Sequence, residues 1–120
     1  MRLVEDAYNP ERDQYYADTL LEEFIQNKGD DFGLWVVHKD MYTGNMNFIF
    51  GIASYGRGAM VSIFRIDSLK LIEKEGTHEV GHVLGLGHCM NYCVMRFSNS
   101  LYEAKQKPGY LCEKCKGKLK

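Results

Sequence analysis

The spacing of apolar residues along the chain predicts a first helix near residue 20. Four apolar residues recur at the three- and four-residue spacing of a helix that buries one face: Leu20, Leu21, Phe24 and Ile25. Thr19 followed by Glu22 fits a capping box, so we expect the helix to begin at Thr19. Gly29 predicts its end, because glycine readily takes the left-handed conformation that terminates helices.

Three runs rich in β-branched and aromatic residues predict strands. Residues 34–38 (LWVVH) form a short, uniformly apolar run, which favours a central position in a sheet. Residues 47–55 and 59–66 are two more such runs, and the Gly-Arg-Gly between them predicts a hairpin or a short loop. His38 ends the first run, and no metal-ligand spacing includes it, so we expect no metal role for it.

A second helix is predicted after the hairpin, with Asp67 or Ser68 as its cap. Its apolar positions run along most of its length: Leu69, Ile72, Val80, Val83 and Leu84. Gly85 and Gly87 predict its end, and the chain from Cys89 onward carries little periodic signal. This order of elements predicts an α/β or α+β fold. We expect a small twisted mixed sheet packed with helices, followed by an irregular C-terminal segment.

Composition narrows the class of protein. The chain has 120 residues, of which 45% are hydrophobic and 26% charged, so we expect one folded domain over residues 1–120. No apolar run approaches the ~20 residues of a membrane-spanning helix. The first residues lack the apolar stretch of a secretory signal, which predicts a cytoplasmic protein. The net charge of -1 gives no overall attraction for nucleic acid or membranes.

Charge is unevenly distributed along the chain. Residues 1–31 hold nine acids and three bases, whereas residues 89–120 hold seven bases and two acids. A solvated face and a frayed tail are the favoured interpretation, and an anionic partner for the basic end is the alternative.

The sequence HEVGHVLGLGH places three histidines and a glutamate in the second helix and its turn. His78 and His82 are four residues apart, so both imidazoles project from one helix face and can bind one cation. Glu79 lies beside the first, where its carboxylate can reach water on the metal. Gly85 allows a sharp turn, which would return His88 as a third ligand.

Zinc prefers such nitrogen ligands, and three protein ligands leave one position open, as in catalytic zinc sites. Zinc lowers the pKa of its water to ~7 and polarises a carbonyl group. We expect Glu79 to take the proton of the zinc-bound water as general base and deliver it to a leaving amine. The pattern therefore predicts hydrolysis of an amide, with a peptide bond as the favoured substrate. Two core histidines beside an unrelated glutamate are the alternative, and the agreement of helix, glycine and third histidine argues against it.

Four cysteines lie in the last 32 residues: Cys89, Cys93, Cys112 and Cys115. Three residues separate the first pair, eighteen the middle pair and two the last pair, which suits a closed Cys₄ zinc site. Four thiolates leave no position for water, so this zinc would be structural and would stabilise residues 89–120. Reactive thiols or a redox pair are the alternatives.

HExxHxxGxxH followed at once by cysteine, then Cys93-Val94-Met95 and a C-x₂-C pair, resembles the archaemetzincins, zinc metallopeptidases of the metzincin clan. The resemblance covers about residues 4–120 and includes residues 7–24 and 93–103 and both strands of the predicted hairpin. It implies two zinc ions per chain, one catalytic and one structural. The implied catalytic ligands are His78, His82 and His88, with Glu79 as base; the implied structural ligands are Cys89, Cys93, Cys112 and Cys115. Met95 would match the Met-turn methionine, a hydrophobic floor beneath the histidines.

The chain departs from the family pattern in two places. It has one residue fewer between its first two cysteines, and we expect no counterpart of the usual N-terminal strand–helix–strand region, as in a naturally short or a trimmed form. Losing strands exposes a sheet edge, through which self-association is possible.

The expected partner is a peptide or protein substrate, paired with an edge strand within residues 47–63. No membrane partner is expected, and nucleic acid is disfavoured. The alternative function is a non-catalytic or latent two-zinc module that binds a peptide or nucleic acid through residues 105–120.

Overall fold

The computed structural model describes residues 3–119, so Met1, Arg2 and Lys120 lie outside the described part. Its elements follow one another in this order: 3-10 helix η1 (Glu5–Ala7), β1 (Tyr8–Asn9), β2 (Gln14–Tyr16), α1 (Ala17–Asn27), β3 (Leu34–Val37), β4 (Met41–Tyr42), β5 (Gly51–Ser54), β6 (Gly58–Ser62), α2 (Leu69–Val83), α3 (Leu101–Gln106) and α4 (Glu113–Lys118). This mixture of helices and strands confirms the predicted fold class.

The strands form two small mixed sheets. One has the order β1-β2-β4 and the other the order β3-β6-β5, with β3 parallel and β5 antiparallel to β6. The predicted hairpin is therefore confirmed as β5 and β6. The central position predicted for residues 34–38 is wrong, because β6 lies in the middle and β3 at an edge. Only one side chain of β3, Val37, is fully buried, whereas all five residues of β6 are.

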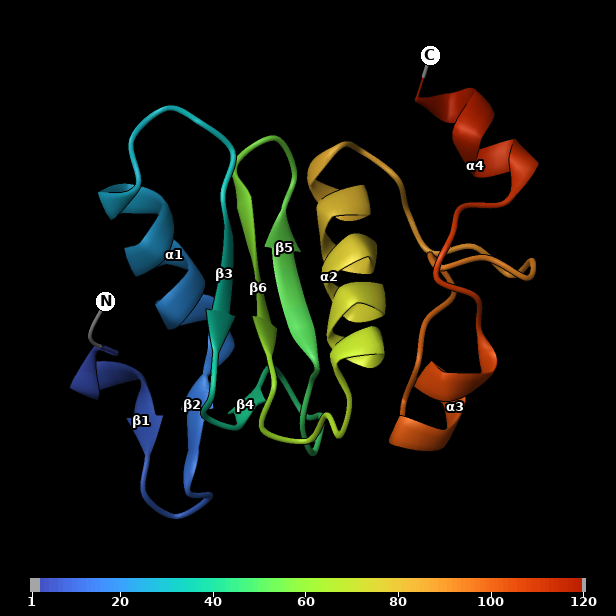
Figure 1. The fold of residues 1–120 in the computed structure, drawn as a ribbon. Helices are drawn as coiled ribbons and strands as arrows, with labels where there is room; N and C mark the ends of the chain where they lie inside the picture. Colours follow the sequence, from blue (N-terminus) through green and yellow to red (C-terminus); the bar gives the residue numbers. More distant parts are fainter. Residues whose placement is uncertain (1–2, 120) are drawn as a thin grey trace.

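The larger sheet lies between two helices, with α1 on one face and α2 on the other (Figure 1). The main apolar core fills the α1 side, where Phe24 stacks on Trp35 with ring centroids 5.3 Å apart. Helix α1 ends near Gly29 as predicted, but it begins at Ala17, two residues before the predicted cap. Thr19 is therefore inside the helix, because β2 leads directly into α1 and Ala17 is already fully buried.

Helix α2 begins and ends where the sequence predicts. Ser68 caps it, since its side chain accepts a hydrogen bond from Leu71 N at 3.2 Å. The apolar positions are a different matter: Leu69 is 71% exposed, and Val80 and Leu84 are also exposed. Val83 is buried as expected, and the helix also buries three polar side chains toward the sheet and the C-terminal segment: Glu75, His78 and Glu79.

The C-terminal segment is more ordered than predicted, because it contains α3 and α4. Helix α3 is fixed to α2 by Lys74, whose ammonium donates to the carbonyls of Ala104 (3.1 Å) and Lys107 (2.7 Å). The segment lies beyond α2, on the side away from the sheet (Figure 1). None of the helices described in residues 3–119 has the length and apolar character needed to cross a membrane.

Candidate metal centre and active site

The three predicted histidines come together at the C-terminal end of α2. Their ligand atoms all lie within 4.8 Å of one another, and His78 Nε2 is 3.2 Å from His82 Nε2. Two nitrogen ligands of a tetrahedral zinc ion, each at about 2.0–2.1 Å, lie about 3.3 Å apart. The spacing of these imidazoles therefore fits zinc. The fourth histidine, His38, is exposed and is absent from the candidate metal-binding groups of the described residues.

Hydrogen bonds fix the tautomers of the first two histidines. His78 Nδ1 lies 2.7 Å from Val94 O, and His82 Nδ1 lies 2.7 Å from Leu86 O. A carbonyl oxygen only accepts, so both Nδ1 atoms carry the proton and both Nε2 lone pairs are free for a metal. Burial, helped by the nearby Lys107 ammonium, lowers the pKa of His78 to about 3. The imidazole is therefore neutral at neutral pH, as a ligand must be.

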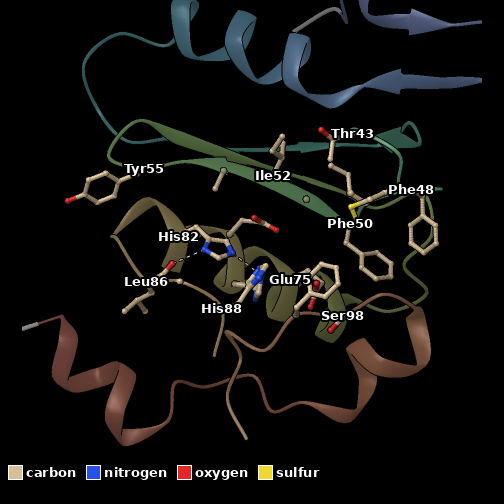
Figure 2. Close-up of a pocket in the computed structure, with 18 of the residues that line it drawn as sticks. Thr43, Phe48, Phe50, Ile52, Tyr55, Glu75, His82, Leu86, His88 and Ser98 are labelled. Carbon is tan, nitrogen blue, oxygen red and sulfur yellow. Dashed lines mark hydrogen bonds between the residues drawn. The ribbon is translucent and has the colours of Figure 1, made fainter. Parts of the chain in front are cut away.

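The turn after α2 returns His88 to the other two. Gly85 has a φ of 100°, a left-handed conformation that suits glycine. Gly85 N donates to His82 O (3.0 Å) and Leu86 N to Gly81 O (2.9 Å), the paired bonds of a Schellman motif. The His88 ring then lies 4.9 Å from that of His82, and Figure 2 shows the two side chains directed toward each other.

Glu79 is buried next to the sheet and lines the same pocket as the histidines. A Cβ added at Gly51 of β5 would stand 2.7 Å from Glu79 Cγ and Oε2, so only glycine leaves room for this carboxylate. Burial, and secondarily the nearby Glu75 carboxylate, raises the pKa of Glu79 to about 8. Sequence reasoning missed Gly51, although a glycine inside a strand-like run is a signal of close approach.

Met95 supports α2 from beneath. It is fully buried, and its sulfur packs against Gly81, where any larger residue would collide with it. Met95 O accepts from Cys89 N at 3.0 Å, which links this residue to the chain just after His88. Its position agrees with the floor implied by the family resemblance.

The four cysteines form a second group beside the first. Their sulfur atoms lie within 4.8 Å of one another, and Cys89 Sγ is 3.8 Å from Cys112 Sγ. Thiolates at about 2.3 Å from a tetrahedral zinc ion are about 3.8 Å apart, so this spacing also fits zinc. The short spacing between Cys89 and Cys93 does not keep the four apart. Cys93 Sγ also accepts from Cys112 N at 3.3 Å, which ties the two halves of the group together.

The acidities of two cysteines differ strongly. The backbone N–H of Cys115 is the main cause that lowers the pKa of Cys112 to about 6. Desolvation is the main cause that raises the pKa of Cys115 to about 12. A thiolate is therefore already favoured at Cys112, and a bound metal would ionise the other cysteines.

A pocket of about 600 Å³ joins the histidines to an apolar wall. Figure 2 shows β5 on one side of it and α2 with the C-terminal segment on the other, with Phe48 and Phe50 at one end and Tyr55 at the opposite end. The pocket is therefore a cleft along β5 with the histidine cluster between its ends.

Comparison with known proteins places the chain in a family. The family model described as "Peptidase family M54" matches residues 2–120. The chain belongs to peptidase family M54.

An archaemetzincin of Nanoarchaeum equitans is 49% identical over 109 residues, which are 91% of this chain and 64% of that protein. Among solved structures, the archaemetzincin of Methanopyrus kandleri has a TM-score of 0.93 at 40% identity, covering 98% of this chain and 71% of that one. The structure described as a zinc-dependent peptidase from Methanocorpusculum labreanum has a TM-score of 0.89 at 29% identity, covering 100% and 81%. The chain thus spans about two thirds to four fifths of the length of these three proteins.

Proposed function

We propose that the protein is a zinc-dependent metallopeptidase that hydrolyses peptide bonds. The observation that carries the proposal is the histidine cluster, where two Nε2 atoms 3.2 Å apart are freed for a metal by hydrogen bonds at Nδ1. Family membership supports zinc as that metal. His78, His82 and His88 would hold it and leave one coordination position open, as catalytic zinc sites do.

Glu79 is the proposed general base. When bound, zinc polarises the scissile carbonyl and makes water more acidic. The Glu79 carboxylate lines the cleft, from which it would accept the proton of the attacking water and pass it to the leaving amine. Its raised pKa in the absence of a cation reflects burial, and a bound cation would favour the ionised form that a base needs.

The edge of β5 is the proposed binding strand for an extended peptide. Phe50 O accepts from Ser62 N at 2.7 Å, so alternation along the strand turns the main-chain groups of Gly51 and Ala53 away from β6. Both residues line the cleft. A substrate pairing there would gain main-chain hydrogen bonds and pass beside the histidines.

The cysteine group is the proposed second zinc site. Four thiolates would complete a closed tetrahedron, so this zinc would stabilise the segment after α2 rather than react. The chain would then carry two zinc ions and act as one domain over residues 1–120, with the cysteine site inside it.

The test compares the parent with Glu79→Gln and with a matched control, Glu73→Gln, an exposed glutamate on the same helix. Zinc content is measured for each, followed by mass-spectrometric analysis of a digested peptide library. We expect all three proteins to bind two zinc ions and only Glu79→Gln to lose cleavage. Two zinc ions with no cleavage by the parent would instead favour a non-catalytic or latent module, and unchanged cleavage by Glu79→Gln would exclude the proposed base.

A further inference from the structure

A buried lysine lies beneath the histidine cluster, and no step proposed above uses it. The side chain of Lys107 is 1% exposed. Its ammonium lies 3.1 Å from Glu75 Oε2, 2.8 Å from Arg96 O and 3.4 Å from His78 Nδ1. Burying an ammonium group costs several kcal/mol unless its partners compensate, so this placement needs a reason.

The contacts of Lys107 hold a stretch of main chain that in turn holds a histidine. Val94 O receives the Nδ1 hydrogen bond of His78, and Arg96 O receives a hydrogen bond from the Lys107 ammonium. These two carbonyls flank Met95, so the main chain on both sides of it is fixed. Removing the ammonium would release one of these two attachments and loosen the acceptor that orients the imidazole.

Lys107 is held at a fixed point of the chain, and its positive charge is paired with a carboxylate. Its own carbonyl accepts from Lys74 at 2.7 Å, which ties the end of α3 to α2. Its ammonium pairs with Glu75, which is equally buried. A lone buried lysine would repel a metal cation, whereas the pair is electrically neutral beside the imidazoles.

We propose that Lys107 is a positioning residue of the histidine cluster. It fixes residues 94–96 and the Glu75 carboxylate, so that His78 keeps its Nε2 directed at the metal. The inference rests on the proposed metal site and adds a residue to it. Loss of a hydrogen-bonded partner behind a metal ligand typically weakens metal affinity or activity by about 10–100-fold, and we expect an effect of that size.

The experiment uses Co²⁺ as the probe, with the variant Lys107→Met and the control Lys105→Met. Lys105 lies two residues earlier, is about half-exposed and pairs with the exposed Asp67. Cobalt absorption separates the two sites, because thiolate charge-transfer bands report on the cysteines, and visible bands that grow with no rise in these charge-transfer bands report on the histidines. Lys107→Met should bind cobalt at the histidines about 10–100-fold more weakly, with altered visible bands and unchanged thiolate bands. Its kcat should fall with little change in KM, and the control should match the parent.

A merely structural lysine would give a different result. Lys107→Met would then unfold at a lower temperature, yet bind cobalt at the histidines with parental affinity and spectrum while folded; that outcome would overturn the proposal. Should the single variant fail to fold, Glu75→Gln combined with Lys107→Met removes both buried charges and still leaves Arg96 O without its donor. Parental cobalt affinity in this double variant would overturn the proposal equally.

The same titration separates the two proposals. A parent protein that binds no cobalt at its histidines overturns the proposed function and this inference together. A parent that binds cobalt there, with Lys107 variants that bind it equally well, overturns only the role given to Lys107.

Discussion

Replacing Gly51 with alanine tests the geometry of the proposed base most directly. The added Cβ would stand 2.7 Å from Glu79 Cγ, from Glu79 Oε2 and from Met60 O. Ordinary contacts begin at 3.4 Å, so either the carboxylate or the strand must move by roughly 0.7 Å. Met60 O is a backbone atom of the adjacent strand β6, which is buried throughout, so β5 must shift away from it and the Glu79 side chain must yield as well.

Two magnitudes follow for Gly51→Ala. Overpacking of this kind costs about 1–3 kcal/mol of unfolding free energy. A displacement near 1 Å at a reacting group costs on the order of 100-fold in rate, so kcat should fall roughly that far. Zinc content should stay parental, because the three atoms nearest to the new methyl group belong to Glu79 and Met60 and not to the proposed ligands.

The assay combines peptide cleavage, zinc analysis and thermal unfolding. Gly109→Ala is the matched control, because its Cβ would meet no atom within 4 Å and its backbone is not left-handed. Parental kcat and parental stability in Gly51→Ala would show that the close approach between β5 and Glu79 is not a constraint. The assigned position of the base would then be wrong.

Two further predictions concern stability. Cys115→Ser should bind one zinc ion instead of two. Hydrogen exchange should then show lost protection of Val94 N, which donates to Tyr110 O at 2.8 Å in the segment that the cysteine site would stabilise. Full protection of Val94 N in a variant with one zinc ion would refute a stabilising role for the cysteine site. Burial alone would raise the pKa of Asp40, but hydrogen bonds from Arg65 and Gln14 lower this pKa overall. The Asp40 carboxylate therefore stabilises the folded state at pH values above 3.8, the pKa in the unfolded chain, and this stabilisation is lost as the pH falls below that value. The difference in unfolding free energy between the parent and Asp40→Asn should therefore shrink between pH 7 and pH 3, and a constant difference in denaturant titrations would contradict the assignment.

Local patterns in the sequence predicted the elements better than their positions in the fold. Ser68 and Gly85 mark the ends of α2 because caps and left-handed turns depend only on neighbouring residues. The place of β3 at a sheet edge depends instead on which strands surround it, and that information is absent from residues 34–38. Thr19 fits a cap by its spacing, yet the burial of Ala17 starts the helix earlier.

The residues of the candidate site likewise divide into those that a local sequence pattern predicts and those that only the fold reveals. The seven predicted ligands have fixed spacings, and the structure brings them together in two groups. Gly51, in strand β5, and Lys107, at the end of helix α3, contact the site only through the tertiary fold, so no local pattern in the sequence assigns them to it. The prediction that apolar residues define the buried face of α2 failed in part, since Val83 is buried but Leu69 is exposed, and the polar Glu75 is buried.

The polar underside of α2 has a consequence for folding itself. Besides Leu71 and Val83, this helix encloses two carboxylates and an imidazole, and the desolvation of these polar groups opposes its docking. Ions that bind only the native chain would offset that opposition by mass action. The fraction of molecules that survive quality control in the cell would then rise and fall with the supply of zinc.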